Sequence, residues 1–220
     1  MMDQSYFWLR DNNDINTVAT LGPKSSSSEA AAKYFSTLIN RPLKILLFDT
    51  FEEASDYVEL TDSAALLVAN AYQKTDFFYM NPKTLLSGSF FFSPPAYHLC
   101  CKDINALQQK VNNNEVINID THHAPLSRLD DLIKTANPSV IDLSKARFNI
   151  RLSTSTSQAA IHVAEGHSDC CLVNSDSITL YQLKKISAPL TINMTWALFI
   201  KNQQRQKEEA KWTITNAYSS

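Results

Sequence analysis

Short apolar runs separated by helix-length segments constrain the fold of this chain more than any other feature. Lys44–Phe48 and Ala64–Val68 are nearly continuous apolar runs, which are typical of strands buried on both faces. Thr17–Leu21 is a further short strand. Apolar residues at helical spacing lie between these strands, over about 26–39 and 51–60. This part of the chain therefore predicts strand–helix–strand–helix–strand, an α/β fold with a parallel sheet.

A second α/β set follows a break at Pro94-Pro95. These prolines interrupt a long β-like stretch over 85–102, and tandem prolines within a strand indicate a crossing between lobes. The later expected elements are helices at about 103–112, 126–135, 156–165 and 177–183, and strands at Glu115–Ile119, Asn149–Leu152, Cys170–Val173 and Thr195–Ile200.

The expected domain organisation is two lobes, one of them discontinuous. Lobe 1 comprises 14–93 and 175–203, lobe 2 comprises 94–174, and the segments 1–13 and 204–220 are tails. The first tail is expected to be a loose arm, and the polar, helix-prone segment 201–212 a solvated extension.

Composition excludes several classes of function. The chain of 220 residues has a net charge of −2 and no basic field, so we do not expect nucleic acid as a partner. It has no apolar stretch of about 20 residues and no secretory signal, so we expect a cytoplasmic protein without a membrane partner. The four cysteines form the adjacent pairs Cys100-Cys101 and Cys170-Cys171, which favour reduced core thiols over zinc or redox chemistry.

Two expected helix starts have similar sequences. SSSSEAAA spans 25–32 and STSQAA spans 155–160, and both place Glu or Gln three residues after a capping hydroxyl, at Ser26 and Ser155. A helix N-terminus offers unpaired N–H groups and a partial positive charge, and so it can hold a carboxylate. In matching positions of two lobes, the pair predicts the binding of a small dianion. The alternative for each is ordinary capping, which needs no ligand.

The same residues resemble a known family. TLGPKSSSSEAAAKYF (20–35) resembles the opening of prephenate dehydratase domains, and 153–183 resembles the segment that begins a helix in their second lobe. Within this prephenate dehydratase-like family, the chain is most similar to the prephenate decarboxylases of bacilysin-type biosynthesis. The stretches that carry this similarity are FDTFEEA (48–54), LVANAY (67–72), FFYMNP (77–82), THHAPL (121–126) and INMTWALF (192–199).

The resemblance implies a fold and a function. The fold would be the two-lobed periplasmic-binding-protein type II architecture, with a ligand cleft between the lobes. The function would be decarboxylation of prephenate to a dihydro-4-hydroxyphenylpyruvate without aromatisation, for an unusual amino acid or an antibiotic, with no cofactor and no metal. The substrate would be prephenate or a similar dicarboxylate, and a homodimer is left open. The alternatives are a prephenate dehydratase that gives phenylpyruvate and a non-catalytic protein that binds a small dianion.

The resemblance also implies site residues. The hydroxyl-rich starts would hold the pyruvyl carboxylate, and the ring carboxylate would face Trp196 and Tyr72. The substrate-binding candidates are Ser26, Ser27, Ser28, Asn70, Ser155, Thr156, Ser157 and Trp196, and the acid–base candidates are Tyr72, His122 and Thr195. Plain packing is the alternative role for Tyr72, and a loop or N-cap position is the alternative for His122.

Departures from both groups bear on the activity. Dehydratases carry Asn-x-Thr-Arg-Phe where this chain has Asn193–Ala197, so Thr195 is kept but the carboxylate-clamping arginine is replaced by Trp196. Because Thr195 is shared with the dehydratases, dehydratase activity stays an alternative. Decarboxylases carry Gly-Thr where this chain has Ser25-Ser26, and Pro-His where it has Ala69-Asn70. A side chain at position 25 occupies a place where glycine lets the backbone approach a ligand.

Overall fold

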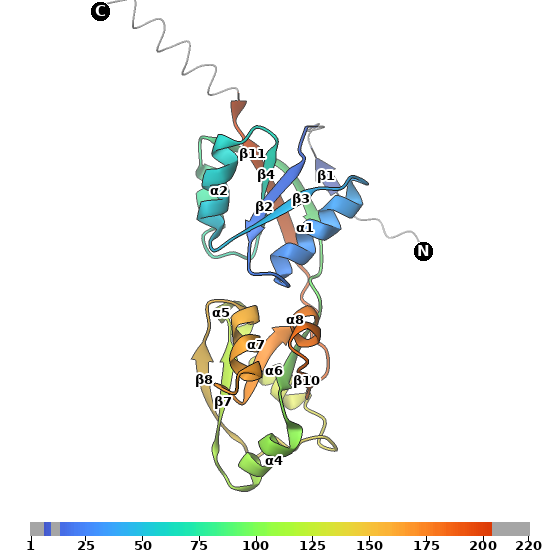
Figure 1. Ribbon diagram of the computed structural model, residues 1–220, viewed down its shortest axis with the longest axis vertical. Coiled ribbons are helices and arrows are strands. Elements are labelled where there is room, and N and C mark those ends of the chain that lie inside the picture. The colour runs from blue at the N-terminus through green and yellow to red at the C-terminus, as the bar shows by residue number, and fades with distance from the viewer. Residues whose placement is uncertain (1–6, 10–13, 204–220) are drawn as a thin grey trace, which may run out of the picture. The chain divides into compact units, whose positions relative to one another are not determined.

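The computed structural model describes residues 7–9 and 14–203, and the predicted tail 204–220 lies outside these residues. Contacts divide the described chain into two compact units (Figure 1). The first unit contains the residues up to Gly22, 31–92 and those from Met194, and the second contains Pro23–Ala30 and Ser93–Asn193. This grouping differs from the predicted lobes at 23–30 and 175–193, which pack with the second unit.

Unit 1 is built on a six-stranded sheet in the order β1-β5-β11-β4-β2-β3. Its elements are β1 (Phe7–Leu9), β2 (Thr17–Leu21), α1 (Ser27–Leu38, of which the first residues group with unit 2), β3 (Lys44–Phe48), α2 (Phe51–Leu60), β4 (Ala64–Ala69), α3 (Thr75–Met80), β5 (Thr84–Phe91) and β11 (Thr195–Lys201). Strand β2 pairs in parallel with β3 and β4, as predicted. The prediction that residues 1–13 form a loose arm was wrong at β1, because this strand pairs antiparallel with β5.

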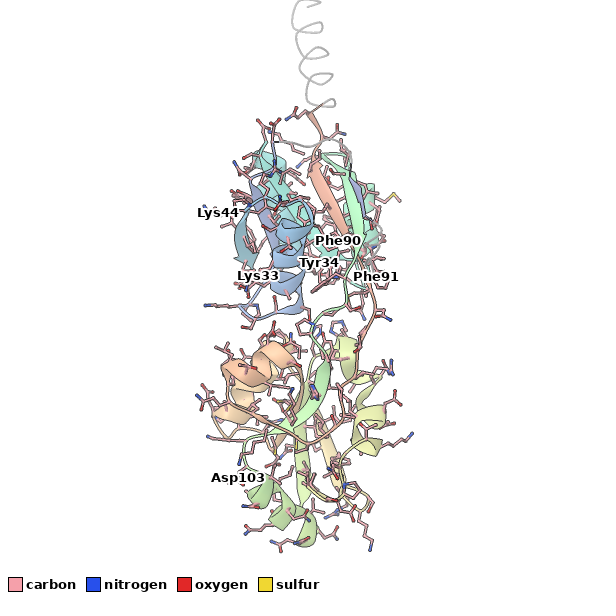
Figure 2. The ribbon with its side chains drawn as sticks, turned by 90° about the vertical axis from the view of Figure 1, so that its right-hand side faces the viewer. Lys33, Tyr34, Lys44, Phe90, Phe91 and Asp103 are labelled. Atoms are coloured by element: carbon pink, nitrogen blue, oxygen red, sulfur yellow. The ribbon has the colours of Figure 1, made fainter. Side chains whose placement is uncertain are left out.

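Helices on both faces of the unit 1 sheet explain its apolar strands. Alternate residues of β4 point to opposite faces. Ala65 and Leu67 pack in the cluster that contains α1, whereas Leu66 and Val68 pack in the cluster that contains α2. Figure 2 labels Tyr34 of α1 and Phe90 of β5, whose ring centroids lie 6.0 Å apart. A strand covered on both faces needs apolar side chains at every position, which is the pattern of Ala64–Ala69.

Unit 2 is built on a five-stranded sheet in the order β10-β6-β9-β7-β8. Its elements are β6 (Tyr97–Cys101), α4 (Ile104–Asn112), β7 (Val116–Thr121), α5 (His123–Leu126), α6 (Leu129–Lys134), β8 (Arg147–Leu152), α7 (Thr156–Ala164), β9 (Cys170–Asn174), α8 (Ser175–Leu180) and β10 (Lys184–Lys185). The helix expected at about 126–135 is observed as α6, which is shorter than expected, and the four-residue α5 precedes it. A turn in which the Arg128 N–H donates to the Pro125 carbonyl separates α5 from α6.

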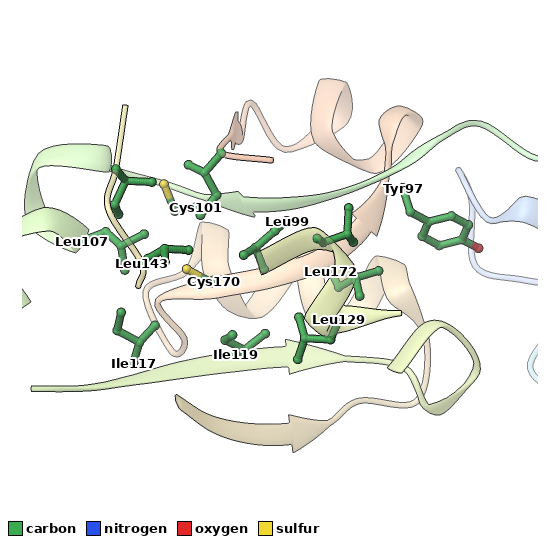
Figure 3. Packing of buried hydrophobic residues seen from close by; sticks show 13 residues of the cluster. Tyr97, Leu99, Cys101, Leu107, Ile117, Ile119, Leu129, Leu143, Cys170 and Leu172 are labelled. Atoms are coloured by element: carbon green, nitrogen blue, oxygen red, sulfur yellow. The ribbon is translucent and has the colours of Figure 1, made fainter. Parts of the chain in front are cut away.

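The core of unit 2 also lies on both faces of its sheet. Leu99, Ile119 and Leu172 belong to the cluster that includes Leu107 of α4 and residues of α6 (Figure 3). The opposite cluster combines Cys100, Cys171 and Val173 with Ala159, Ala160 and Val163 of α7. Figure 3 shows Tyr97 at the end of the first cluster, with its hydroxyl directed away from the other side chains.

The two serine-rich starts do not occupy matching positions, contrary to the prediction. Helix α1 follows β2, the middle strand of the parallel set β3-β2-β4. Helix α7 follows β8, the edge strand of the parallel set β8-β7-β9, so its topological counterpart in unit 1 is α2. Moreover, both starts group with unit 2. The similar sequences of the two helix starts therefore reflect the same capping chemistry. They do not reflect equivalent topological positions in the two units.

Candidate functional site

The start of α1 has the predicted capping arrangement. The Ser26 hydroxyl accepts a hydrogen bond from the Glu29 N–H at 3.1 Å, and the Glu29 carboxylate accepts one from the Ser25 N–H at 2.5 Å. The N–H groups of Ser27 and Ser28 donate to no acceptor among the described residues. These two groups are therefore left for a ligand, as expected for the first turn of a helix.

The start of α7 has the same chemistry. The N-cap residue Ser155 has extended backbone angles, and its hydroxyl accepts from the Gln158 N–H at 3.0 Å. Within the described chain, the N–H groups of Thr156 and Ser157 have no acceptor. This helix start therefore provides a second pair of donors that can hold an anion.

A buried polar chain connects the two starts within unit 2. The fully buried side chain of Asn174 donates to the Ser25 carbonyl at 3.2 Å and accepts from the Ser177 N–H at 2.9 Å. The Ser177 hydroxyl lies 3.4 Å from that of Ser157. Because each member is fixed by a partner, the chain holds both starts in place before any ligand arrives.

Tyr97 adds a further contact to the start of α1. Its hydroxyl lies 3.0 Å from the hydroxyl of Ser27, and its side chain is buried. Burial raises the pKa of Tyr97, while the hydrogen bond to Ser27 acts in the opposite direction. Tyr97 therefore stays a neutral phenol and can donate a hydrogen bond to the serine.

Burial decides which predicted groups of the two starts are accessible. Ser26 and Ser28 are at most 8% exposed and Ser157 is fully buried, whereas Ser27, Ser155 and Thr156 are partly exposed. The hydroxyls of Ser26 and Ser155 are also occupied by capping bonds. The backbone N–H groups are consequently the main donors that these segments offer.

Unit 1 brings together two other predicted residues. The Asn70 side-chain amide donates to the Thr195 hydroxyl at 2.8 Å, and the backbone N–H of Asn70 donates to the Thr195 carbonyl at 3.0 Å. The Tyr79 hydroxyl donates to the Asn70 side-chain oxygen at 3.4 Å. The sequence did not indicate Tyr79 as a site residue. Its side chain is 44% exposed, whereas the neighbouring Phe78 is fully buried.

Tyr72 is held by unit 1 in a way that favours the packing alternative. Its ring centroid lies 4.8 Å from that of Phe51, and its hydroxyl donates to the Glu52 carboxylate at 3.1 Å. Burial and the neighbouring carboxylate raise the pKa of Tyr72 to about 12. Its proton is therefore committed to Glu52 and leaves only with difficulty.

His122 is the N-cap residue of α5, and its Nδ1 accepts from the Ala124 N–H at 3.4 Å. Burial, followed by the charge of His123, lowers the pKa of His122 to about 4. The imidazole is therefore neutral at pH 7 and only a weak proton acceptor there.

The Trp196 side chain is 1% exposed and lies in the core cluster that contains α1 residues. Its indole N–H donates to the Phe92 carbonyl at 3.2 Å. In this position the side chain supports the backbone next to Thr195 and presents no open surface of its own.

A further polar cluster in unit 2 was not predicted. The Asp120 side chain is 3% exposed; one oxygen accepts from Arg151 Nε at 2.8 Å, and the other lies 2.5 Å from His162 Nδ1. Burial alone would raise the pKa of Asp120, but hydrogen bonds from His162, Arg151 and Ser168 outweigh it and lower that pKa. The cluster lines a pocket of ≈ 290 Å³ together with Leu152 and His167. Asp120, Arg151 and His162 lie far apart in the chain, so no motif or regular spacing in the sequence marks the cluster.

The described residues contain no group of three or more His, Cys, Asp or Glu side chains arranged to hold a metal ion. No described helix combines the length and the apolar character needed to cross a membrane. The four cysteines are free and buried, which confirms the prediction of reduced core thiols.

Comparison with known proteins relates the chain to curated enzymes. No family model matches it. A prephenate decarboxylase from Planktothrix agardhii is 31% identical over 205 residues, which cover 89% of this chain and 94% of the relative. A prephenate decarboxylase from Bacillus subtilis strain 168 is 32% identical over 193 residues, which cover 84% of this chain and 86% of the relative.

Solved structures share the fold at low identity. A prephenate dehydratase from Arthrobacter aurescens, in complex with L-Phe, matches with a TM-score of 0.63 at 14% identity. The match covers 84% of this chain and 60% of that longer chain. The dehydratase from Staphylococcus aureus matches with a TM-score of 0.57 at 12% identity, covering 85% of this chain and 67% of its own. These likenesses confirm the α/β, prephenate dehydratase-like fold. At 31–32% identity over nearly all of its length, the chain belongs to the prephenate decarboxylase family.

Proposed function

We propose that this chain is a carboxy-lyase that decarboxylates prephenate without aromatising its ring. The observation that carries the proposal is the near full-length match to proteins named prephenate decarboxylase. Two features support it independently. The starts of α1 and α7 provide unpaired N–H donors suited to a carboxylate, and the arginine expected of a dehydratase is replaced by Trp196.

The substrate's pyruvyl carboxylate is assigned to the helix starts of unit 2. Ser26, Ser27 and Ser28 of one start, with Ser155, Thr156 and Ser157 of the other, supply backbone N–H groups or the caps that orient them. Each contact of an anion with a helix terminus contributes about 0.3–1 kcal/mol when exposed and up to ~2 kcal/mol when partly buried. Rigid donors of this kind are effective because little is spent on ordering them.

The reaction breaks the bond between the ring and its carboxylate. The electron pair of that bond enters the ring diene, carbon dioxide leaves, and a proton adds to a ring carbon while the ring hydroxyl stays. A dehydratase, in contrast, needs an acid at that hydroxyl. Among the acid–base candidates, Thr195 has the accessible hydroxyl, with Asn70 as its hydrogen-bond partner. Tyr72 holds its proton against Glu52, and His122, with a pKa of about 4, is neutral and only a weak base near pH 7.

Asn70 and Trp196 are assigned supporting roles in the same reaction. Asn70 orients the Thr195 hydroxyl and offers its side chain to the substrate. Trp196 fixes the β11 strand beside Thr195 from within the core. The product would serve the synthesis of an unusual amino acid or an antibiotic in the cytoplasm, and a second copy of the chain is a candidate partner.

One incubation tests the proposal. Purified protein is mixed with prephenate, and the products are followed by proton NMR. We expect carbon dioxide release and a non-aromatic dihydro-4-hydroxyphenylpyruvate. Phenylpyruvate instead would identify a dehydratase and contradict the proposal. Unchanged prephenate with line broadening on addition of protein would indicate a binding protein without this activity.

A further inference from the structure

Strand β8 forms one edge of the unit 2 sheet and lies at its outer side in Figure 1. It pairs in parallel with β7 over all six of its residues. Within the described part of the chain no strand pairs with its other side, so the N–H and C=O groups along that outer edge have no strand partner. An open edge of this kind is a template for the addition of another strand.

The helices of unit 2 leave apolar side chains of β8 uncovered. Phe148 and Ile150 lie beside Ile117 and Ile119 of β7, on the face of the sheet that packs against α4 and α6. Ile119 is fully buried, whereas Ile150 is 47% exposed and Leu152, two residues later, is 64% exposed. The helix layer therefore covers β7 and stops short of the end of β8.

The usual devices that protect an edge strand are missing from β8. Its sequence, RFNIRL, has no proline, no lysine and no acidic residue. Arg147 donates to the carbonyl of Asn114. Arg151 donates to the Asp120 carboxylate at 2.8 Å and to the His167 carbonyl at 2.6 Å. The two cations of the strand are thus engaged by groups of their own unit.

We propose that the outer edge of β8 is a self-association surface, at which a second copy of this chain adds its own β8 in antiparallel orientation. Two identical strands related by a twofold axis form a closed contact in which each copy uses the same residues. The two five-stranded sheets then form one continuous sheet. The inference is independent of the proposed reaction, in which no residue of β8 is assigned a part.

The order of residues in β8 suits one register of this pairing. With Ile150 opposite Ile150 of the second copy, Phe148 lies opposite Leu152, so every apolar side chain of the strand has an apolar partner. On the other face, Asn149 lies opposite Arg151, a polar pair without like charges. Cross-strand pairs of suitable residues each contribute about 0.2–1 kcal/mol.

The neighbouring registers are less favourable. With Asn149 opposite its own copy, Arg147 lies opposite Arg151, and like charges directly opposite each other are destabilising. The register between these two places Phe148 opposite Arg151. The pattern of charged and apolar residues therefore fits an antiparallel copy of the same strand, centred on Ile150, which identifies a second copy of this chain as the occupant.

The size of the contact sets its expected strength. Six residues at about 3.3 Å each span about 20 Å, and one pair of such strands is a small contact beside the roughly 1,200–2,000 Å² of a stable interface. The dimer should therefore be reversible, and its population should rise with the protein concentration.

Sedimentation of the purified full-length chain, from about 10 µM to about 1 mM, tests the proposal. The average mass should rise from the 24.7 kDa of one chain toward twice that value. Ile150→Lys places like charges opposite each other at the centre of the contact, so the rise should need at least about tenfold more protein. Met80→Lys, the same change at a 78% exposed apolar side chain of unit 1, is the control and should leave the rise unchanged.

Two results of this measurement would overturn the inference. The first is a mass that stays at one chain throughout, which is expected if the edge receives a strand of another protein or none. The second is a rise in mass that Ile150→Lys leaves unchanged, which would place the contact on another surface.

A disulfide cross-link tests the register. The native cysteines are free and buried, so a new surface thiol reports on its own position. In Ile150→Cys the altered residues lie opposite each other, at the Cα separation of about 4.5–5.5 Å of antiparallel pairs, which suits a disulfide. Mild oxidation should join these chains at least about tenfold faster than chains with Asn149→Cys, whose altered residues are not opposite each other. Equal rates, or no cross-linked dimer, would contradict the proposed pairing.

Discussion

At the scale of single residues, Ser25 has a backbone that the sequence alone does not suggest. Its φ angle is +66°, in the left-handed region that favours glycine. The resemblance to decarboxylases implies glycine at this position, and glycine adopts such an angle without a steric penalty. The strained residue is kept in place by its own backbone, since its N–H donates to Glu29 and its carbonyl accepts from Asn174.

Ser25→Gly should therefore stabilise the protein. Removal of a Cβ from a left-handed residue gains about 1 kcal/mol, from which the greater freedom of glycine in the unfolded chain subtracts part. The remaining gain is below about 1 kcal/mol and should raise Tm by less than about 4 °C for a domain of this size, measured by calorimetry. Ser25→Ala, which keeps the Cβ, is the control and should give no rise. A lower Tm for the glycine variant would show that the serine is unstrained.

The Thr195 hydroxyl is the residue-scale candidate for catalysis. Thr195→Val keeps the shape of the side chain and removes the acceptor of the Asn70 hydrogen bond. We expect kcat to fall by about 10²-fold, the usual loss for one positioned polar group, and the free energy of unfolding to change by less than about 0.5 kcal/mol at this exposed site. Thr195→Ser should retain most of the activity. Equal kcat in the valine variant would remove Thr195 from the mechanism.

At the scale of elements, α7 and α2 provide a natural comparison. Ser155 and Thr50 are both N-cap residues with extended backbone angles, and each accepts from the N–H three residues later, at 3.0 and 3.1 Å. The two caps therefore contribute similarly to stability. Only the first belongs to a helix start to which we assign the substrate carboxylate.

Ser155→Ala and Thr50→Ala should separate capping from binding. Each should lower the free energy of unfolding by about 1 kcal/mol, measured by urea denaturation, because one N–H loses its acceptor. Only Ser155→Ala should also raise KM for prephenate, because its helix start is displaced from the substrate. A rise in KM of the same size in both variants would mean that the effect reflects stability and not a site.

At the scale of the whole molecule, a set of carboxylates links stability to pH. The pKa values of Glu52, Glu59 and Asp120 are lowered: burial opposes this, but hydrogen bonds and cations outweigh the burial. A group whose pKa is lowered by folding stabilises the fold when ionised. Its contribution is complete above the ordinary value, 4.5 for the glutamates and 3.8 for Asp120, and is lost as the pH falls through the lower folded value.

Asp120→Asn tests this linkage. At pH 7 the variant should unfold about 1–3 kcal/mol more easily than wild type, because Arg151 and His162 lose a buried ionic partner. The difference should shrink as the pH falls below 3.8, the ordinary value for this carboxyl group, because the wild-type carboxylate then becomes protonated. Urea denaturation at several pH values measures both curves. Asp130→Asn, at an exposed carboxylate of α6, is the control, and a pH-independent difference for Asp120→Asn would contradict the linkage.

The fold could largely be predicted from sequence because its strongest signals are local. The apolar run Ala64–Ala69 indicated a strand with both faces covered, and the caps at Ser26 and Ser155 indicated helix starts. The expectation was wrong for the similar run Lys44–Phe48, which forms the partly exposed edge strand β3. Grouping the elements into units depends on contacts between distant segments, which composition does not encode. For this reason residues 23–30 and 175–193 were grouped differently from the observed packing.

The candidate site was predictable only where its chemistry is local. Capping serines carry a spacing signal, and so they were found. Asn174, which links the two starts, and Asp120, which holds His162, act through partners more than 40 positions away, and no period or motif marks them. Trp196 and Tyr72 were expected to face the substrate, but both pack against other side chains. The sequence alone does not tell whether an aromatic residue lines a binding site or fills the core.

The cysteines have a practical consequence for experiments on this protein. Cys100 lies opposite Cys171 and Cys101 opposite Cys170 in adjacent strands, yet all four are free and inaccessible. Burial also raises the pKa of Cys101 to about 11, so little reactive thiolate forms near neutrality. A pair of cysteines engineered on the surface could therefore be coupled to maleimide dyes or spin labels in the wild-type background. Distances between labelled positions could then be followed during turnover without first removing the native thiols.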